Sequence, residues 1–142
     1  MDRASLKSCR RGAVLVEVAL ILPVFCALVF GAIEYGWLFT KAQQVSMAAR
    51  AGARAGALAG GTSGDVSAAV STTLAQSGIS GSQYTMTMSS ATPDTLGRGQ
   101  NFSVSVSVDY GQSTGGLALL RIPLVPVPDR LNAQCTMAKE AP

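Results

Sequence analysis

One uninterrupted apolar stretch near the N-terminus limits what this chain can fold into. It runs from Ala13 to Ile33 and contains a single charged residue, Glu17. A helix needs roughly 20 apolar residues to cross the hydrocarbon core of a bilayer. Charged residues make up only 13% of the chain, about half the share in typical soluble domains. We therefore predict a transmembrane helix over residues 13–33.

Positive charges next to this stretch predict its orientation. Four basic residues precede it, opposed only by Asp2: they are Arg3, Lys7, Arg10 and Arg11. Three further basic residues follow the other end within about twenty positions, but they are less dense and less close. The positive-inside rule then leaves the N-terminus in the cytoplasm and exports the C-terminal part.

An ordinary cleaved signal peptide fits this stretch less well. Its apolar core is usually about 7–15 residues long and is followed by small residues at the cleavage site. Here the bulky sequence Ile33-Glu34-Tyr35-Gly36-Trp37 follows instead. A secreted chain that loses residues 13–33 stays open as an alternative.

Glu17 and the residues before it form the most informative motif. A carboxylate inside a bilayer is costly, so Glu17 is a functional candidate, although it could simply be protonated or reach the interface. The sequence from Arg10 to Glu17, with Gly12 five positions before the glutamate, resembles the processing site of type IV prepilins. The resemblance implies that a prepilin peptidase cuts after Gly12. Glu17 would then pair with the new amino group of Ala13 in a neighbouring subunit, because buried charges need partners.

Three further motifs extend the resemblance to about the first sixty residues. They are Leu22-Pro23, the stretch Phe30–Gly36 and the alanine- and arginine-rich stretch Ala48–Arg54. Together they resemble the N-terminal signature of TadE-like pseudopilins, the type IV pilin-like proteins of tight-adherence pili. Val18 follows Glu17, where the family's major pilin carries a tyrosine, and this chain is much longer than that pilin. Both departures favour a minor or priming component of the pilus assembly apparatus.

The resemblance also implies location and partners. We expect a single-pass protein of the bacterial inner membrane, with residues 1–12 as a cleaved leader. Incorporation into the pilus is the alternative location. Its partners would be the prepilin peptidase, other pilin or pseudopilin subunits, inner-membrane pilus assembly proteins and the lipid bilayer. The alternative function is an unprocessed single-pass protein whose outer domain is a binding module, for example for a surface polymer.

The helix is expected to continue beyond the membrane through residues 34–60. No strong breaker occurs before Gly60-Gly61, and alanine, the best helix former, dominates from Ala48. One helix from about Ala13 to Ala59 is predicted, with a kink or local opening at Pro23. Small residues recur every four positions and form a packing stripe for a partner helix or for the chain's own sheet: Ala48, Gly52, Gly56 and Gly60.

Residues 61–142 are predicted to form a small α+β extracytoplasmic domain. Thr62–Gly64 is interpreted as a linker and Asp65 as the N-cap of a short helix over residues 66–76. Period-two alternation predicts strands at residues 84–89, 102–110 and 131–137. We expect a three-stranded antiparallel sheet packed against the short helix, the long helix or both.

The residues that catalysis and cofactor binding need are missing or scattered. The chain has no histidine, its eight acidic residues form no close pair, and no phosphate-binding glycine loop occurs. Basic residues do not alternate with aromatic ones. We therefore expect no enzyme activity, cofactor, metal site or nucleic-acid binding. Cys9, Cys26 and Cys135 fall in different compartments, so no internal disulfide is expected, and Cys135 is either a cross-link between subunits or a small buried residue.

Overall fold

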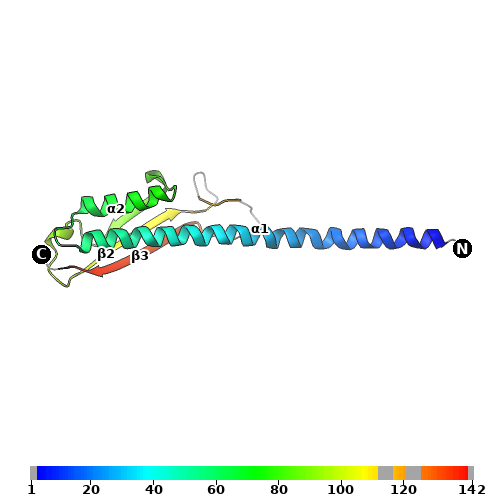
Figure 1. Cartoon of the computed structure of the whole chain (residues 1–142), viewed down its shortest axis with the longest axis horizontal. Helices are drawn as coiled ribbons and strands as arrows, with labels where there is room; N and C mark the ends of the chain where they lie inside the picture. The colour runs from blue at the N-terminus through cyan, green and yellow to red at the C-terminus, as the bar shows by residue number, and fades with distance from the viewer. Residues whose placement is uncertain (1–2, 112–116, 121–125, 141–142) are drawn as a thin grey trace.

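The computed structural model describes residues 3–111, 117–120 and 126–140, with the backbone alone described for residues 3–13. A single long helix, α1 (Arg3–Ala57), carries a small domain at its C-terminal end (Figure 1). That domain consists of α2 (Ser63–Gln76) and the strands β1 (Tyr84–Met88), β2 (Asn101–Asp109) and β3 (Arg130–Ala138). The predicted α+β class, with one long and one short helix, is confirmed.

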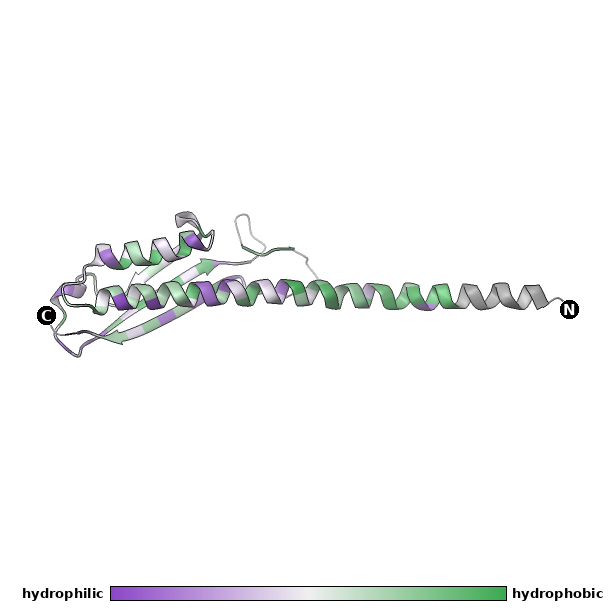
Figure 2. Cartoon of the chain, viewed as in Figure 1, coloured by the Kyte–Doolittle hydropathy of each residue, from purple (hydrophilic) through white to green (hydrophobic). Residues whose placement is uncertain are grey.

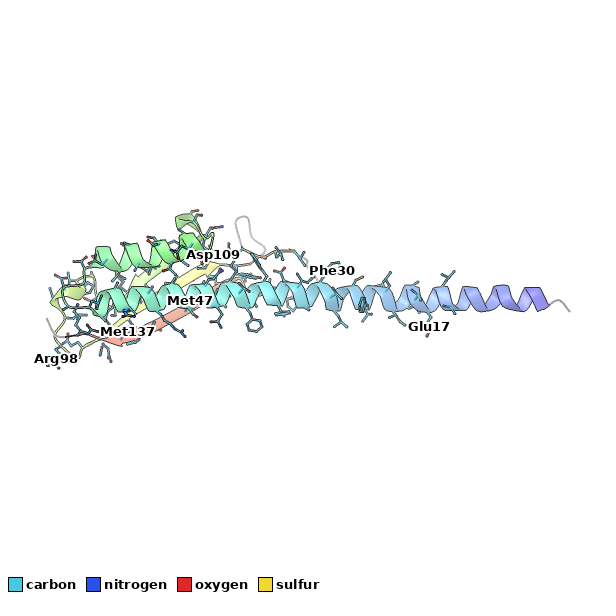
Figure 3. All side chains as sticks on the ribbon, viewed as in Figure 1. Glu17, Phe30, Met47, Arg98, Asp109 and Met137 are labelled. Carbon is cyan, nitrogen blue, oxygen red and sulfur yellow. The ribbon has the colours of Figure 1, made fainter. Side chains whose placement is uncertain are left out.

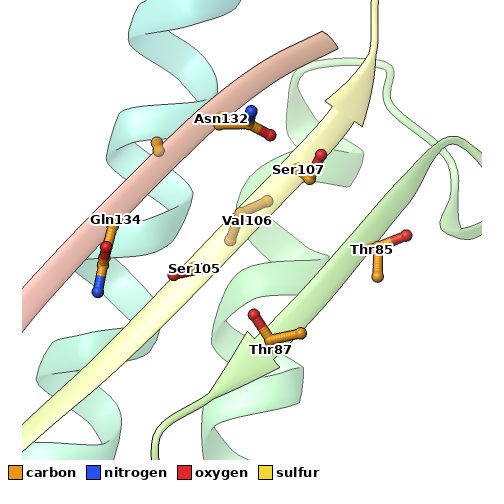
Figure 4. Close-up of a pocket in the computed structure, with 8 residues that line it drawn as sticks. Thr85, Thr87, Ser105, Val106, Ser107, Asn132 and Gln134 are labelled. Carbon is orange, nitrogen blue, oxygen red and sulfur yellow. The ribbon is translucent and has the colours of Figure 1, made fainter.

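The three strands form an antiparallel sheet in the order β1-β2-β3. In its register, Met86 lies opposite Val106, and Val104 lies opposite Cys135. The strict alternation of β2 has the expected result, since its apolar residues are buried and the serines between them are partly exposed. Both helices lie behind the same face of the sheet (Figure 4), so the core fills the space between the sheet and the helices.

Each helix contributes one apolar face to this core. Most buried core residues come from α1, α2, β2 and the start of β3, and a few come from the segments that follow α2 and β2. The largest include Tyr110, Phe102, Leu74 and Val45. From α2, the core takes Val66, Val70 and Leu74, which are spaced four apart as a helix face requires. The domain therefore depends on the outer half of α1 for its core, and the two fold as one unit.

The start of α2 corrects one prediction. Residues 62–64 are not a linker, because Thr62 is the N-cap and the helix begins at Ser63. The Thr62 side chain accepts a hydrogen bond from the Asp65 backbone N–H, and the Asp65 carboxylate accepts one from the Thr62 N–H. Asp65 is therefore the third helical residue of a capping box and not the cap itself.

The ends of both helices follow from local chemistry. After α2, Gly78 adopts a positive φ of 73°, and the Ile79 N–H donates to the Leu74 carbonyl at 3.0 Å, which is a Schellman motif. α1 ends at Ala57, two residues before the predicted Ala59, and Gly60 has a φ of 71°. α1 runs without interruption through Pro23, where a kink or opening was expected (Figure 1).

Candidate membrane and assembly site

The N-terminal half of α1 projects from the domain with its apolar side chains bare. From Val14 to Ile33 nearly every large hydrophobic side chain is exposed, and no other element of the described chain packs on it (Figure 2). This is the one helix among the described residues that is long and apolar enough to cross a membrane, with a mean hydropathy of 2.6 over its most apolar window. We refer to residues 13–33 as the span.

Glu17 is the single carboxylate in the span. Its side chain is exposed and projects from α1 with no other element beside it (Figure 3). Within the described part of the chain it forms no hydrogen bond and no ion pair. An isolated carboxylate on a lipid-exposed surface is unfavourable, so the arrangement leaves Glu17 available for a cation outside this chain. Gly12 and Ala13 lie in the first turns of α1, where only the backbone is described.

The small-residue stripe faces the chain's own domain. Ala48, Gly52 and Gly56 are buried, whereas Gly60 is exposed and lies beyond the end of α1. A methyl group added at Gly52 would come within 2.5 Å of Val70, and one at Gly56 would overlap the ring of Phe102. Glycine is therefore used where α1 comes closest to α2 and β2. This surface is already occupied and is not open to a partner helix.

Sequence reasoning missed the role of Glu34, which lies directly after the span. Its side chain is only 2% exposed. One carboxylate oxygen, Oε1, accepts hydrogen bonds from the Tyr110 hydroxyl at 3.0 Å and from the Leu119 N–H at 3.1 Å. The other, Oε2, accepts one from the Leu120 N–H at 2.8 Å. Burial, followed by the hydrogen bond and negative charge of Glu34, raises the pKa of Tyr110.

This cradle around Glu34 attaches the connection between β2 and β3 to α1. All three donors lie 76 or more positions away along the chain, so no local pattern could have identified them. The available signal was indirect: Glu34 is an acidic residue inside the Phe30–Gly36 motif, at the exact boundary of an apolar stretch. Three donors compensate the buried carboxylate, as buried charges require.

Two aromatic residues within the next turn of α1 add to this attachment. The Tyr35 hydroxyl donates to the Pro126 carbonyl at 2.8 Å, and the Trp37 indole N–H donates to the Leu117 carbonyl at 2.9 Å. Lys41 then lies 4.8 Å from the centre of the Trp37 ring and donates to the last carbonyl of the α2 cap, Ser77, at 2.8 Å. Burial lowers the pKa of Lys41. The ammonium nevertheless suits the negative end of the α2 dipole.

A second lysine closes the other end of the contact between helix and sheet. Lys139 follows β3 and is buried, and its Nζ donates to the carbonyls of Gly56 at 2.9 Å and Leu58 at 2.7 Å. The Glu140 N–H donates to the Ala57 carbonyl at 2.8 Å. Carbonyls at the end of a helix lack partners within it, and here a cation and an N–H from the two residues after β3 bind them.

The outer face of the sheet, which points away from the helices, has a depression lined by polar but uncharged side chains. A shallow depression crosses all three strands and is lined by hydroxyl and carboxamide side chains, with small apolar residues at its base (Figure 4). Its polar residues are Thr85, Thr87, Ser105, Ser107, Asn132 and Gln134. Within the described ranges no group of acidic, cysteine or histidine side chains could hold a metal ion.

Comparison with known families agrees with the segment that the geometry singles out. Residues 12–54 match the family model described as TadE-like protein. The chain carries a TadE-like segment. This segment begins at the expected processing site, contains the whole span with Glu17, and ends within the stripe that packs on the domain. No curated protein and no solved structure matches the chain.

The TadE-like segment suggests a tight-adherence pilus-associated component with an N-terminal membrane helix. The one long apolar helix of the described chain suggests a single-pass membrane anchor. The match ends at Arg54, so the α+β domain beyond α1 is the part that lies outside the family model. The hydrogen bonds that Glu34 accepts, and those that Tyr35, Trp37 and Lys41 donate, join the matched segment to the rest of the chain.

Proposed function

We propose that this protein is a minor or priming structural component of a tight-adherence pilus apparatus. It is anchored in the bacterial inner membrane by the span, with the N-terminus in the cytoplasm and the α+β domain outside. A prepilin peptidase removes residues 1–12 by cleaving after Gly12. The role is structural and not enzymatic. The observation that carries the proposal is the coincidence of the TadE-like match with a bare apolar span whose only charge is Glu17.

The distribution of occupied and free surfaces supports assembly through the span. The small-residue stripe is covered by the chain's own α2 and β2, so it offers nothing to another subunit. The span is uncovered along its length in the described chain. Cleavage after Gly12 would place an amino group four residues from Glu17, within about one turn of helix. In a group of packed subunits this amine and the carboxylate of a neighbour would neutralise each other.

The first test is the intact mass of the protein purified from its native membrane, with and without the prepilin peptidase. We expect a mass that begins at Ala13, and the full-length mass when the peptidase is deleted. A Gly12→Val variant should also keep its leader. Gly36→Ala is the matched control, because an added methyl group at Gly36 meets no other atom within 4 Å. Full-length protein in the wild-type membrane, with unchanged pili in the Gly12→Val strain, would overturn the proposal.

A binding module is the second candidate function, and the depression on the outer sheet face is the observation that favours it. Its hydroxyl and carboxamide groups suit a neutral polar ligand such as a surface polymer. The two functions differ in what they require of the N-terminus. A binding module that needs no processing should tolerate Gly12→Val and should lose its ligand when Ser105 and Ser107 are both replaced by leucine.

A further inference from the structure

The connection between β2 and β3 carries exposed leucines at an unusual place. Leu119 is 49% exposed and Leu120 is 36% exposed, although the backbone N–H groups of both are fixed to the carboxylate of Glu34. We call residues 117–120 and 126–128 the collar. The collar contains only leucine, alanine, proline and valine, so it carries no charged or polar side chain. Such a segment is poorly suited to face water.

The contacts of the collar place it at one level along α1. Its backbone is bonded to the side chains of Glu34, Tyr35 and Trp37, which are adjacent or nearly so on the helix. The span, residues 13–33, is roughly 30 Å long at the rise of an α-helix, about the thickness of a typical hydrocarbon core. If the span fills the core, Glu34 and the collar lie at the outer boundary of the bilayer.

The side chains of α1 at this level are those of a membrane interface. Tyr35 is 39% exposed and Phe39 is 67% exposed, and Trp37 is partly buried beside them. Tyrosine and tryptophan concentrate at the boundary between hydrocarbon and headgroups, where their rings have an apolar and a polar side. The carboxylate that would oppose lipid contact, Glu34, is covered by the collar itself. Leu119 and Leu120 of the collar and Tyr35 and Phe39 of α1 therefore all expose apolar surface close to the level at which the span ends.

We propose that the collar is a second membrane-contact site, in which Leu119 and Leu120 insert into the interfacial region of the outer leaflet. The partner is the lipid surface, and the inference rests on anchoring by the span but not on processing after Gly12. Because the collar is bonded to α1 through Glu34, it sets the depth of the helix and holds the domain at a fixed height. Inserting two leucines buries apolar surface that would otherwise meet water.

The test uses the full chain in lipid nanodiscs and an environment-sensitive fluorophore attached to a single cysteine. Cys9, Cys26 and Cys135 are replaced by alanine, and cysteine is introduced at Leu119. Leu58→Cys is the matched control, since Leu58 is an equally exposed leucine of the domain at the far end of α1. Leu22→Cys reports on the span. Lipids that carry a nitroxide quencher near the headgroup or deep in the acyl chain measure the depth of each label.

We expect blue-shifted emission and strong quenching by the shallow nitroxide at position 119, quenching by the deep nitroxide at position 22, and neither effect at position 58. Equal, water-like emission at positions 119 and 58 with normal quenching at position 22 would overturn the lipid contact of the collar while leaving the proposed function intact. Absence of quenching at position 22 would show that the span does not enter the bilayer and would overturn both proposals. Blue-shifted emission at position 119 that no lipid nitroxide quenches, and that disappears on dilution to one chain per nanodisc, would assign the collar to a second copy and overturn the lipid contact.

Discussion

At the scale of single residues, two glutamates of the TadE-like segment have opposite situations. Glu17 is exposed on a bare helix and has no partner in the described chain, whereas Glu34 is buried and accepts three hydrogen bonds. The sequence identified Glu17, because a charge inside an apolar stretch is conspicuous. It did not identify the role of Glu34, because nothing near position 34 reveals that Tyr110, Leu119 and Leu120 return to it. One carboxylate thus serves the fold and the other is free for assembly.

Replacing Glu34 should therefore destabilise the domain. Glu34→Ala leaves two backbone N–H groups and a tyrosine hydroxyl without acceptors, and we expect a loss of roughly 3 kcal/mol in the free energy of unfolding. Glu34→Gln keeps one acceptor oxygen and should lose less. Trp37 is the only tryptophan of the chain and lies beside the cradle, so its fluorescence during denaturant unfolding in detergent is the measurement. An unchanged midpoint for Glu34→Ala would contradict the cradle.

Gly56 gives a second prediction at this scale. Gly56→Ala would place a methyl group inside the ring of Phe102, and overpacking of this kind costs about 1–3 kcal/mol. Gly31→Ala, where an added methyl group meets no atom within 4 Å, should be neutral or stabilise the helix by up to about 1 kcal/mol. The same unfolding assay compares the two. Equal effects of both substitutions would show that α1 does not pack closely on β2.

At the scale of elements, the strands were predicted to within about one residue, because one face of the sheet packs on the core and the other faces outward, so apolar and polar residues alternate along each strand. In β2, burial alternates between the valines and the serines, and the sequence shows this directly. The short helix was predicted three residues too short, since Thr62–Gly64 has the composition of a loop. Its combination of threonine with an acid three residues later was the missed signal. The small-residue stripe from Ala48 to Gly56 predicted close packing but did not identify the partner, because small residues allow close approach of any apolar surface.

The capping box of α2 predicts an acid-sensitive contribution to stability. Hydrogen bonds from Thr62 lower the pKa of Asp65 in the folded protein. A carboxyl group whose pKa is lowered by folding stabilises the protein above its ordinary pKa of 3.8, and this contribution disappears as the pH falls through the lowered value. Asp65→Asn, which does not titrate, should reduce the difference in unfolding midpoint between about pH 6 and about pH 3.

The same element offers an independent control. Thr62→Ala removes the N-cap side chain and should cost about 1 kcal/mol at neutral pH, and it should also reduce the acid sensitivity because Asp65 loses the Thr62 hydroxyl donor. Ser67→Ala changes an exposed serine of the same helix whose hydroxyl bonds only the Gly64 carbonyl, and it should do neither. An undiminished acid sensitivity in both Thr62→Ala and Asp65→Asn would assign the effect to other carboxylates.

At the scale of the whole molecule, the chain is a rod with a domain fixed to one half and an uncovered apolar surface on the other. Glu34 and Lys139 join the domain to α1 at the two ends of their contact. Cys135 lies on the inner face of β3, partly buried against the core, which suits a small packing residue better than a cross-link. Because the domain and the outer half of α1 form one unit, any force on the span reaches the domain directly.

This separation of surfaces predicts that Glu17 affects assembly alone. Glu17→Ala removes a charge from the span, so insertion becomes no harder, and the domain, which makes no contact with residue 17, keeps its unfolding midpoint. The amino group of a processed neighbour loses its partner, however, and buried unpaired charges oppose packing. We expect normal amounts of processed protein in the inner membrane and a loss of pili and of cross-linked subunits. Glu17→Asp, which retains the charge, is the control and should restore part of both. If Glu17→Ala cells assemble normal pili, the carboxylate has no role in assembly, and the contact between subunits must depend on the apolar side chains of the span alone.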